Sequence, residues 1–231
     1  MRPDQTHQTE DVTPALPTLQ SGISLLEAPD ASRRQTARVI QALVVDHLLL
    51  NRGRIEWVDV GGCASTHPLA SLVPSERSLE RINVARAFTP HQHASLIDEL
   101  AERVTAQTTL VVCPAVDRFY RESECQDDEG QRLLLRAVAQ LSTIARTHDV
   151  PVLVTRTTAD EFAAPIERAA SECLKYEETQ YGPRFTGNAF ETLVYPVGRG
   201  QVQTTLAFWQ QVLADRQALY THSNQVAPVV G

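Results

Sequence analysis

The chain has 231 residues, of which 42% are apolar and 21% charged, and its formal net charge is −7 at pH 7. This composition is typical of a globular domain, and the acidic balance excludes binding of nucleic acid through a large basic surface, which needs clustered Lys and Arg. No apolar run approaches the roughly 18 residues of a membrane-spanning helix, and the N-terminal MRPDQTHQTEDVTP is too polar for a secretory signal. We therefore expect a cytoplasmic protein with no membrane partner.

Helix-like and strand-like segments alternate between two polar ends of the chain. We expect a flexible tail over 1–17, a core domain over 18–213 and a second tail over 214–231. Short apolar runs predict strands, and apolar residues at a 3.6-residue period predict helices. The expected strands are 23–28, 54–60, 82–88, 109–116 and 150–157. The expected helices are 33–51, the second half of 68–82, 90–106 and 131–148.

The alternation predicts an α/β fold, because strands separated by helices form a mostly parallel sheet with helices on both faces. The pattern changes near residue 172. Three segments with strand character then follow, separated by glycine-containing turns. They are LKYEETQYGPRF (174–185), FETLVYPV (190–197) and QVQTTLAFW (201–209). We expect them to add an antiparallel extension to one edge of the sheet.

The four cysteines, Cys63, Cys113, Cys125 and Cys173, lie far apart in the sequence and include no C-x-x-C pair. This spacing supports neither a zinc site nor a redox motif, so we expect reduced thiols.

Any ligand of such a sheet is expected at the carboxyl ends of its strands, in the turns after residues 28, 60, 113 and 157. The first of these turns lies in ISLLEAPDASRRQT (23–36), where an apolar strand leads through a proline-containing turn into a helix. Nucleotide-hydrolysing proteins carry their phosphate loop at this position.

The segment INVARAFTPHQHASLIDELAE (82–102) resembles part of archaeal RadA and related eukaryotic recombinases, in which a strand ending Ala-Arg-Ala-Phe precedes a helix with Leu-Ile-Asp-Glu or Leu-Leu-Asp-Glu. Segments on either side resemble the RecA-like core in the same order, over residues 16–209. They include LPTLQSGISLLEAP, TLVVCPAVDRFYRE and GNAFETLVYPVGRGQVQTTLAF. The resemblance implies a RecA-like, mostly parallel sheet flanked by helices, with a C-terminal antiparallel extension.

The residues that perform phosphoryl transfer in this family are replaced here. A phosphate loop, G-x-x-x-x-G-K-[ST], needs glycines for close backbone approach, a Lys for the phosphates and a hydroxyl for Mg²⁺. The acidic metal ligand and the catalytic Glu of the family correspond to Cys113 and Gly61. We therefore expect no catalytic residues, no metal and no resident cofactor. The remaining, vestigial nucleotide site would comprise Ala28, Arg33, Arg34, Gln35, Thr36, Asp59 and Cys113.

Two interpretations of the arginines in this turn stay open. Arg33 and Arg34 begin a helix, where the free N–H groups favour an anion, so ATP or another phosphate could dock without being cleaved. Alternatively, both arginines are solvated or paired with a carboxylate such as Glu27. A third hypothesis is an unorthodox ATPase in which Arg34 replaces the lysine and Asp59 recruits the metal.

RecA-like recombinases meet DNA through two loops, after the strands that here end at Cys113 and Arg156. The first loop contains an acidic cluster that would repel phosphates, formed by Glu122, Glu124, Asp127, Asp128 and Glu129. The second is followed by the only basic and aromatic mixture nearby. Its candidate DNA-binding residues are Arg156, Lys175 and Arg184. The accompanying Tyr176, Tyr181 and Phe185 are more readily explained as sheet-packing residues.

The resemblance and the lost motifs together predict a catalytically degenerate, non-hydrolysing accessory or regulatory factor in DNA recombination or repair. Its expected partner is a recombinase or a sister RecA-like paralogue, with DNA contact weak or indirect. The 17-residue tail holds neither the family's helical DNA-binding domain nor its Phe-x-x-Ala motif, so we expect no long filament. A RecA-like regulatory module unrelated to DNA remains the alternative.

Overall fold

A computed structural model describes residues 15–29, 31–121, 128–179, 182–188, 191–193 and 206–225. Its described strands form one mixed sheet in the order β3-β2-β4-β5-β1-β6-β7-β8. The strands are β1 (Gly22–Glu27), β2 (Arg54–Asp59), β3 (Ile82–Arg86), β4 (Thr108–Cys113), β5 (Pro151–Val154), β6 (Glu172–Thr179), β7 (Gly182–Thr186) and β8 (Glu191–Leu193). The pairs from β3 to β6 are parallel, and β6–β7 and β7–β8 are antiparallel. The expected α/β class, with its antiparallel extension, is confirmed.

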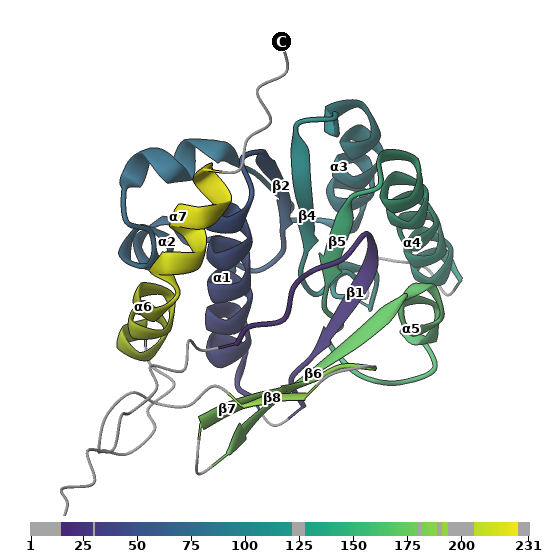
Figure 1. Ribbon diagram of the computed structural model, residues 1–231. Coiled ribbons are helices and arrows are strands. Elements are labelled where there is room, and N and C mark those ends of the chain that lie inside the picture. Colours follow the sequence, from purple (N-terminus) through teal and green to yellow (C-terminus); the bar gives the residue numbers. More distant parts are fainter. Residues whose placement is uncertain are drawn as a thin grey trace, which may run out of the picture.

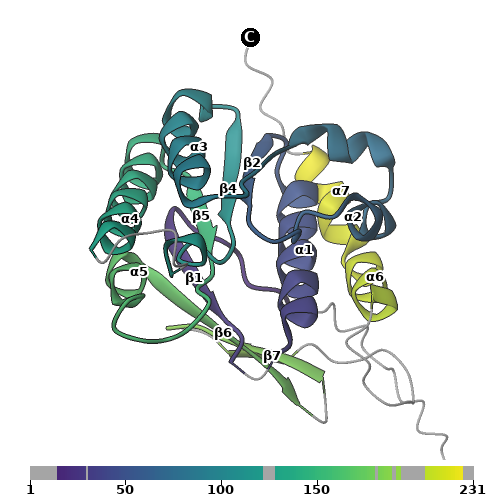
Figure 2. The ribbon, with the colours of Figure 1, turned by 180° about the vertical axis from the view of Figure 1, so that it is seen from behind.

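Helices cover both faces of the sheet (Figures 1 and 2). They are α1 (Arg33–Leu50), α2 (Thr66–Leu72), α3 (Pro90–Arg103), α4 (Glu129–His148), α5 (Ala164–Ala169), α6 (Leu206–Asp215) and α7 (Gln217–Gln225). Two short 3₁₀ helices, η1 (Glu76–Arg81) and η2 (Phe119–Arg121), lie in the connections. In the described part of the chain, none of the helices has the length and apolarity needed to span a bilayer.

The two helix layers enclose separate apolar cores. On one face, α1, α2, α6 and α7 pack over alternate strand residues such as Leu26 and Trp57. On the other face, α3, α4 and α5 pack over their neighbours in the same strands, such as Leu25 and Val58. Because consecutive strand residues point to opposite faces, strands that are apolar throughout supply both cores.

Helix α1 begins at a well-formed N-cap. The Ser32 hydroxyl accepts a hydrogen bond from the Gln35 amide at 3.3 Å, and the Gln35 side chain accepts one from the Ser32 amide at 2.8 Å. This capping box satisfies donors that a helix end otherwise leaves free. Helix α3 begins similarly, with Thr89 as its N-cap and Pro90 in its first turn.

The third predicted strand of the extension, over 201–209, is wrong for its described part, because Leu206–Trp209 belongs to α6. Of the segment that the sequence assigned to a tail, residues 214 and 215 lie in α6 and residues 217–225 form α7. Trp209, Val212 and Leu213 are buried in the core that contains α1. A short apolar run suits a strand or a buried helix equally well, and its packing against α1 selects the helix.

A buried polar cluster joins these terminal helices to α1. Asp46 of α1 accepts hydrogen bonds from Arg216 Nε at 2.7 Å, Arg216 Nη2 at 3.0 Å and the Tyr220 hydroxyl at 2.6 Å. Asp46 is 3% exposed and Arg216 6% exposed. The contacts tie residues that are about 170 positions apart in the sequence into one buried network.

The connection between β2 and β3 contains two short helices, whereas the sequence predicted a single helix in the second half of 68–82. Helix α2 occupies the first half of that segment, and η1 covers Glu76–Arg81. Pro74 lies between them and cannot donate a backbone hydrogen bond, so it separates the two helical turns. Helix α5 was not expected from the sequence.

Candidate functional site

A cleft of about 680 Å³ lies at the carboxyl ends of β1, β2, β4 and β5. It is formed by the four turns in which the sequence placed a ligand site. The described residues that line it are Leu26, Glu27, Ala28, Pro29, Ala31, Arg33, Thr36, Ile40, Val60, Cys63, Pro114, Ala115, Arg118, Thr155, Arg156, Thr157 and Ala159. Its volume is that of a small-molecule site, which typically spans about 300–1,000 Å³.

The vestigial residues separate into two groups in the structure. Ala28, Arg33 and Thr36 line the cleft. Arg34 faces a neighbouring hollow of about 420 Å³, between α1 and the start of α2, which Arg33 also lines. Gln35 is engaged in the cap of α1 and donates to Glu178 at 2.8 Å. The resemblance aligns Arg34 with the Lys and Gln35 with the Ser/Thr of a phosphate loop, and neither residue lines the cleft.

The side chain of Arg33 lies in the space that residue 61 leaves empty. Its Nη2 donates to the Gly61 carbonyl at 3.2 Å and lies 1.7 Å from the position that a Cβ on Gly61 would take. Gly61 also has a φ of +78°, a conformation that L side chains rarely adopt. Where the resemblance places a catalytic Glu, the structure therefore has a guanidinium group.

Neither of the two remaining vestigial residues can hold a metal in this conformation. Cys113 is fully buried, and burial raises the pKa of its thiol to about 12. Asp59 is also fully buried, and its carboxylate accepts hydrogen bonds from the Ala64 amide at 3.1 Å and Arg86 Nε at 2.8 Å. Among the described residues, no group of three or more His, Cys, Asp or Glu side chains could hold a metal ion. The unorthodox ATPase would need Asp59 to recruit the metal, and in this structure that carboxylate is already bound by Ala64 and Arg86.

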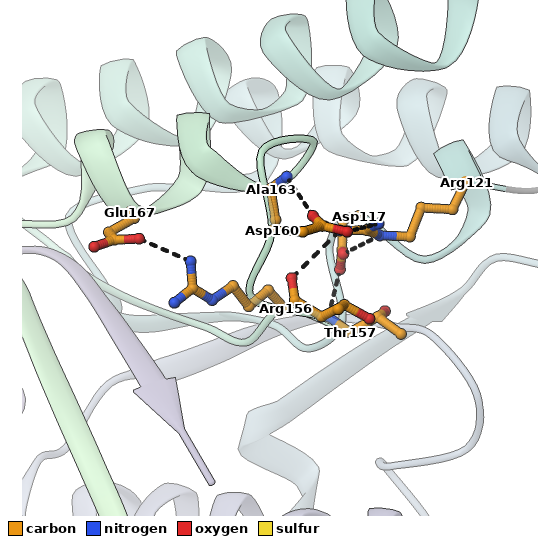
Figure 3. Close-up of polar contacts among 8 residues, drawn as sticks. Asp117, Arg121, Arg156, Thr157, Asp160, Ala163 and Glu167 are labelled. Carbon is orange, nitrogen blue, oxygen red and sulfur yellow. Dashed lines mark hydrogen bonds and ion pairs between the residues drawn. The ribbon is translucent and has the colours of Figure 1, made fainter. Parts of the chain in front are cut away.

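The loops after β4 and β5 are joined by a clamp made of Asp117, Arg121 and Asp160 (Figure 3). Arg121 binds Asp117 at 2.5 Å and reaches both carboxylate oxygens of Asp160, at 2.6 and 2.8 Å. The other oxygen of Asp117 accepts from the Thr157 amide at 2.7 Å. The hydrogen bond from Arg121 lowers the pKa of Asp160 to about 2. The clamp holds together the two loops that the resemblance assigns to DNA contact.

All three candidate DNA-binding residues are engaged with carboxylates. Arg156 pairs with Glu27 and with Glu167, the latter at 2.9 Å (Figure 3). Lys175 and Arg184 both bind Glu177, each at 2.5 Å. A phosphate would have to compete with these carboxylates for each cation.

The aromatic residues near these cations are mostly internal. Tyr176 and Phe185 are buried, with ring centroids 5.4 Å apart, so their predicted role in sheet packing is confirmed. Tyr181 lies outside the described residues, as do Glu122, Glu124 and Asp127 of the acidic cluster and the cysteine Cys125.

Sequence reasoning missed three residues that shape the cleft and its rim. Arg118 lines the cleft from the loop after β4, and Asp117 and Arg121 build the clamp beside it. All three follow β4 directly, in a turn that the fold class already marked as a ligand region. Their charges, in a turn expected to bind a ligand, could have identified them. The acidic cluster farther along the loop instead made the loop look unsuited to binding an anion.

Comparison of the chain with protein-family models finds no match, and no curated protein matches its sequence. What the cleft can do therefore follows from its own residues.

Proposed function

We propose that this chain is a catalytically degenerate RecA/RadA-like protein, which serves as a non-hydrolysing accessory or regulatory factor in DNA recombination or repair. It acts through contacts with a recombinase or a sister RecA-like paralogue, and any contact with DNA is weak or indirect. The order of the resembling segments supports the family, and the observed α/β sheet agrees with the fold that the resemblance implies.

One observation carries the non-hydrolysing part of the proposal, namely the guanidinium of Arg33 beside Gly61. Phosphoryl transfer needs a metal to neutralise the phosphates and a carboxylate to orient the attacking water. A guanidinium at the carboxylate's place repels the metal and cannot accept a proton. Cys113, which replaces the family's acidic metal ligand, is buried and protonated at neutral pH.

An assay of ATP turnover by the full chain, with and without Mg²⁺, tests this part. We expect no phosphate release above that of a buffer control. Magnesium-dependent turnover that Arg34→Ala abolishes would contradict the proposal and favour the unorthodox ATPase.

The open edge of the sheet supports the protein-contact part. Strand β3 ends the strand order, so its outer edge has no strand partner among the described residues. Val84 on this strand is 44% exposed, and Phe88 just after it is 70% exposed. An edge with free backbone groups and exposed apolar side chains is suited to adding an extended segment of a partner as a further strand. We assign this edge to the recombinase or paralogue.

Affinity capture from the native host, with the full chain as bait, tests the assignment. Phe88→Asp is expected to lose the recombinase or paralogue that the unmodified chain recovers. Leu135→Asp is the matched control, because Leu135 is also an exposed apolar residue, 48% exposed, but lies on α4. Recovery of no recombination or repair protein, or equal recovery with both variants, counts against the proposal. Recovery of signalling proteins alone would favour the regulatory module unrelated to DNA.

A further inference from the structure

Two arginines from different elements meet at the mouth of the cleft. Arg33 Nη2 and Arg118 Nη1 lie 1.7 and 2.7 Å from a single point, the position of a Cβ on Gly61. Arg33 comes from the first turn of α1, and Arg118 from the loop after β4. Among the described residues, neither forms an ion pair with a carboxylate. Two like charges this close repel each other, so the arrangement favours an anion that contacts both.

The neighbouring polar groups already have partners within the chain. The Thr36 hydroxyl donates to the Ser32 carbonyl at 3.2 Å, and the Thr155 hydroxyl accepts from the Ala115 amide at 2.7 Å. Glu27, the only carboxylate among the described lining residues, is paired with Arg156. The two guanidinium groups are therefore the part of the lining best able to bind a ligand of opposite charge.

The inner wall of the cleft is apolar. Leu26, Ile40 and Val60, all buried, contribute to it, and Pro114 and Ala115 continue it on the β4 side. A hydrated inorganic ion would leave this apolar wall in contact with water, whereas the apolar part of an organic molecule would pack against it and bury it.

We propose that the cleft binds a small organic anion without a divalent metal. A carboxylate or phosphate group of the ligand is held between Arg33 and Arg118, and its apolar part lies against Leu26, Ile40 and Val60. Guanidinium groups bind both kinds of oxyanion through paired hydrogen bonds. The site does not depend on the proposed recombinase partner, because it uses a different surface from the β3 edge.

Isothermal titration calorimetry of the full chain tests the proposal with phenyl phosphate, benzoate and the uncharged benzyl alcohol, each with and without Mg²⁺. We expect at least one of the two anions to bind and benzyl alcohol not to bind. The tighter anion identifies the preferred head group. Inorganic phosphate, which lacks an apolar part, is expected to bind more weakly than phenyl phosphate. Magnesium is expected to leave the affinity for benzoate unchanged and not to strengthen that for phenyl phosphate.

Variants separate the arginine pair from general positive charge. Arg33→Gln and Arg118→Gln should each weaken binding about tenfold or more, the usual effect of losing a charge-assisted hydrogen bond. Arg34→Gln, next to Arg33 but outside the cleft lining, should change it less than about twofold, as expected for an exposed charge. Circular dichroism of each variant checks that the fold is kept.

Three results would overturn the proposal. They are no binding of either anion at millimolar concentration, binding that both arginine variants leave unchanged, and binding that requires Mg²⁺.

Discussion

The substitution Arg216→Met probes whether the terminal helices are an integral part of the fold. Arg216 donates to both carboxylate oxygens of Asp46. When these bonds are lost, the Tyr220 hydroxyl is the one side-chain donor to Asp46 that remains among the described residues. Met has a length similar to that of the apolar stem of Arg but carries no charge, so the main change is a buried carboxylate deprived of its counter-charge.

The expected loss of unfolding free energy is about 3–5 kcal/mol, the usual cost of removing one partner from a buried ion pair. For a chain of this size, the loss corresponds to a fall in Tm of about 10 °C. Arg136→Met is the matched control. Arg136 pairs with Asp98 at 2.8 Å, but the two side chains are 67% and 38% exposed, so the expected loss is below about 1 kcal/mol.

Urea unfolding followed by tryptophan fluorescence measures both variants. Trp57 lies on β2 and Trp209 on α6, and both are buried in the core that contains α1. The double variant Asp46→Asn with Arg216→Met should recover more than half of the loss, because a neutral amide removes the unpaired charge and still accepts from Tyr220. A loss below about 1 kcal/mol for Arg216→Met, or no recovery in the double variant, would refute the reasoning.

The remaining predictions concern the loop clamp, a buried histidine and a buried thiol. Among the described residues, Arg121→Ala leaves the buried Asp117 with the Thr157 amide as its hydrogen-bond donor, so it should cost about 2 kcal/mol and speed amide hydrogen exchange in both loops. Unchanged exchange would contradict the clamp. Burial lowers the pKa of His93 to about 4, and its Nδ1 lies 2.8 Å from the Tyr120 hydroxyl. Because the unfolded state binds the proton first, stability contributed by neutral His93 is present above about pH 6.5 and falls by about 3 kcal/mol as the pH drops to about 4. His93→Gln should therefore flatten the stability profile between these pH values, and a difference from the unmodified chain that does not change with pH would exclude this role. Cys113 should resist iodoacetamide at pH 8 in the native protein and react after unfolding in urea, as checked by peptide mass spectrometry; alkylation of the native thiol would show that it reaches solvent.

The sequence was sufficient for the fold class. Apolar strands that alternate with amphipathic helices bury their apolar surface efficiently only as a parallel sheet between two helix layers. The local hydrophobic patterns were therefore enough to predict this architecture. The same patterns failed over LAFW (206–209), where a short apolar run has no periodicity long enough to separate strand from helix. Contact with α1 decides that case, and this contact joins distant parts of the chain.

The turns that would form a ligand site were also predictable, because parallel strands always present their carboxyl ends at one edge of the sheet. The sequence did not predict which side chains come together at that edge. Arg33, Gly61 and Arg118 lie far apart in the sequence, and only the folded sheet brings the two arginines to the space above the glycine. The expectation that the family's catalytic groups are missing rested on residue identities, whereas the approach of two arginines to Gly61 depends on three-dimensional proximity.

The pairing of charges shows the same division. Arg156, Lys175 and Arg184 were candidates for DNA contact because they are basic and lie near one loop. Arg156 is instead paired with Glu27 of β1 and Arg184 with Glu177 across the β6–β7 pair, whereas Lys175 binds Glu177 within its own strand. The types of residue and their order along the chain determine the secondary structure and the turns in which a site lies. Charge neutralisation acts between groups a few ångströms apart in space, so for Arg156 and Arg184 the tertiary structure decides which carboxylates those are.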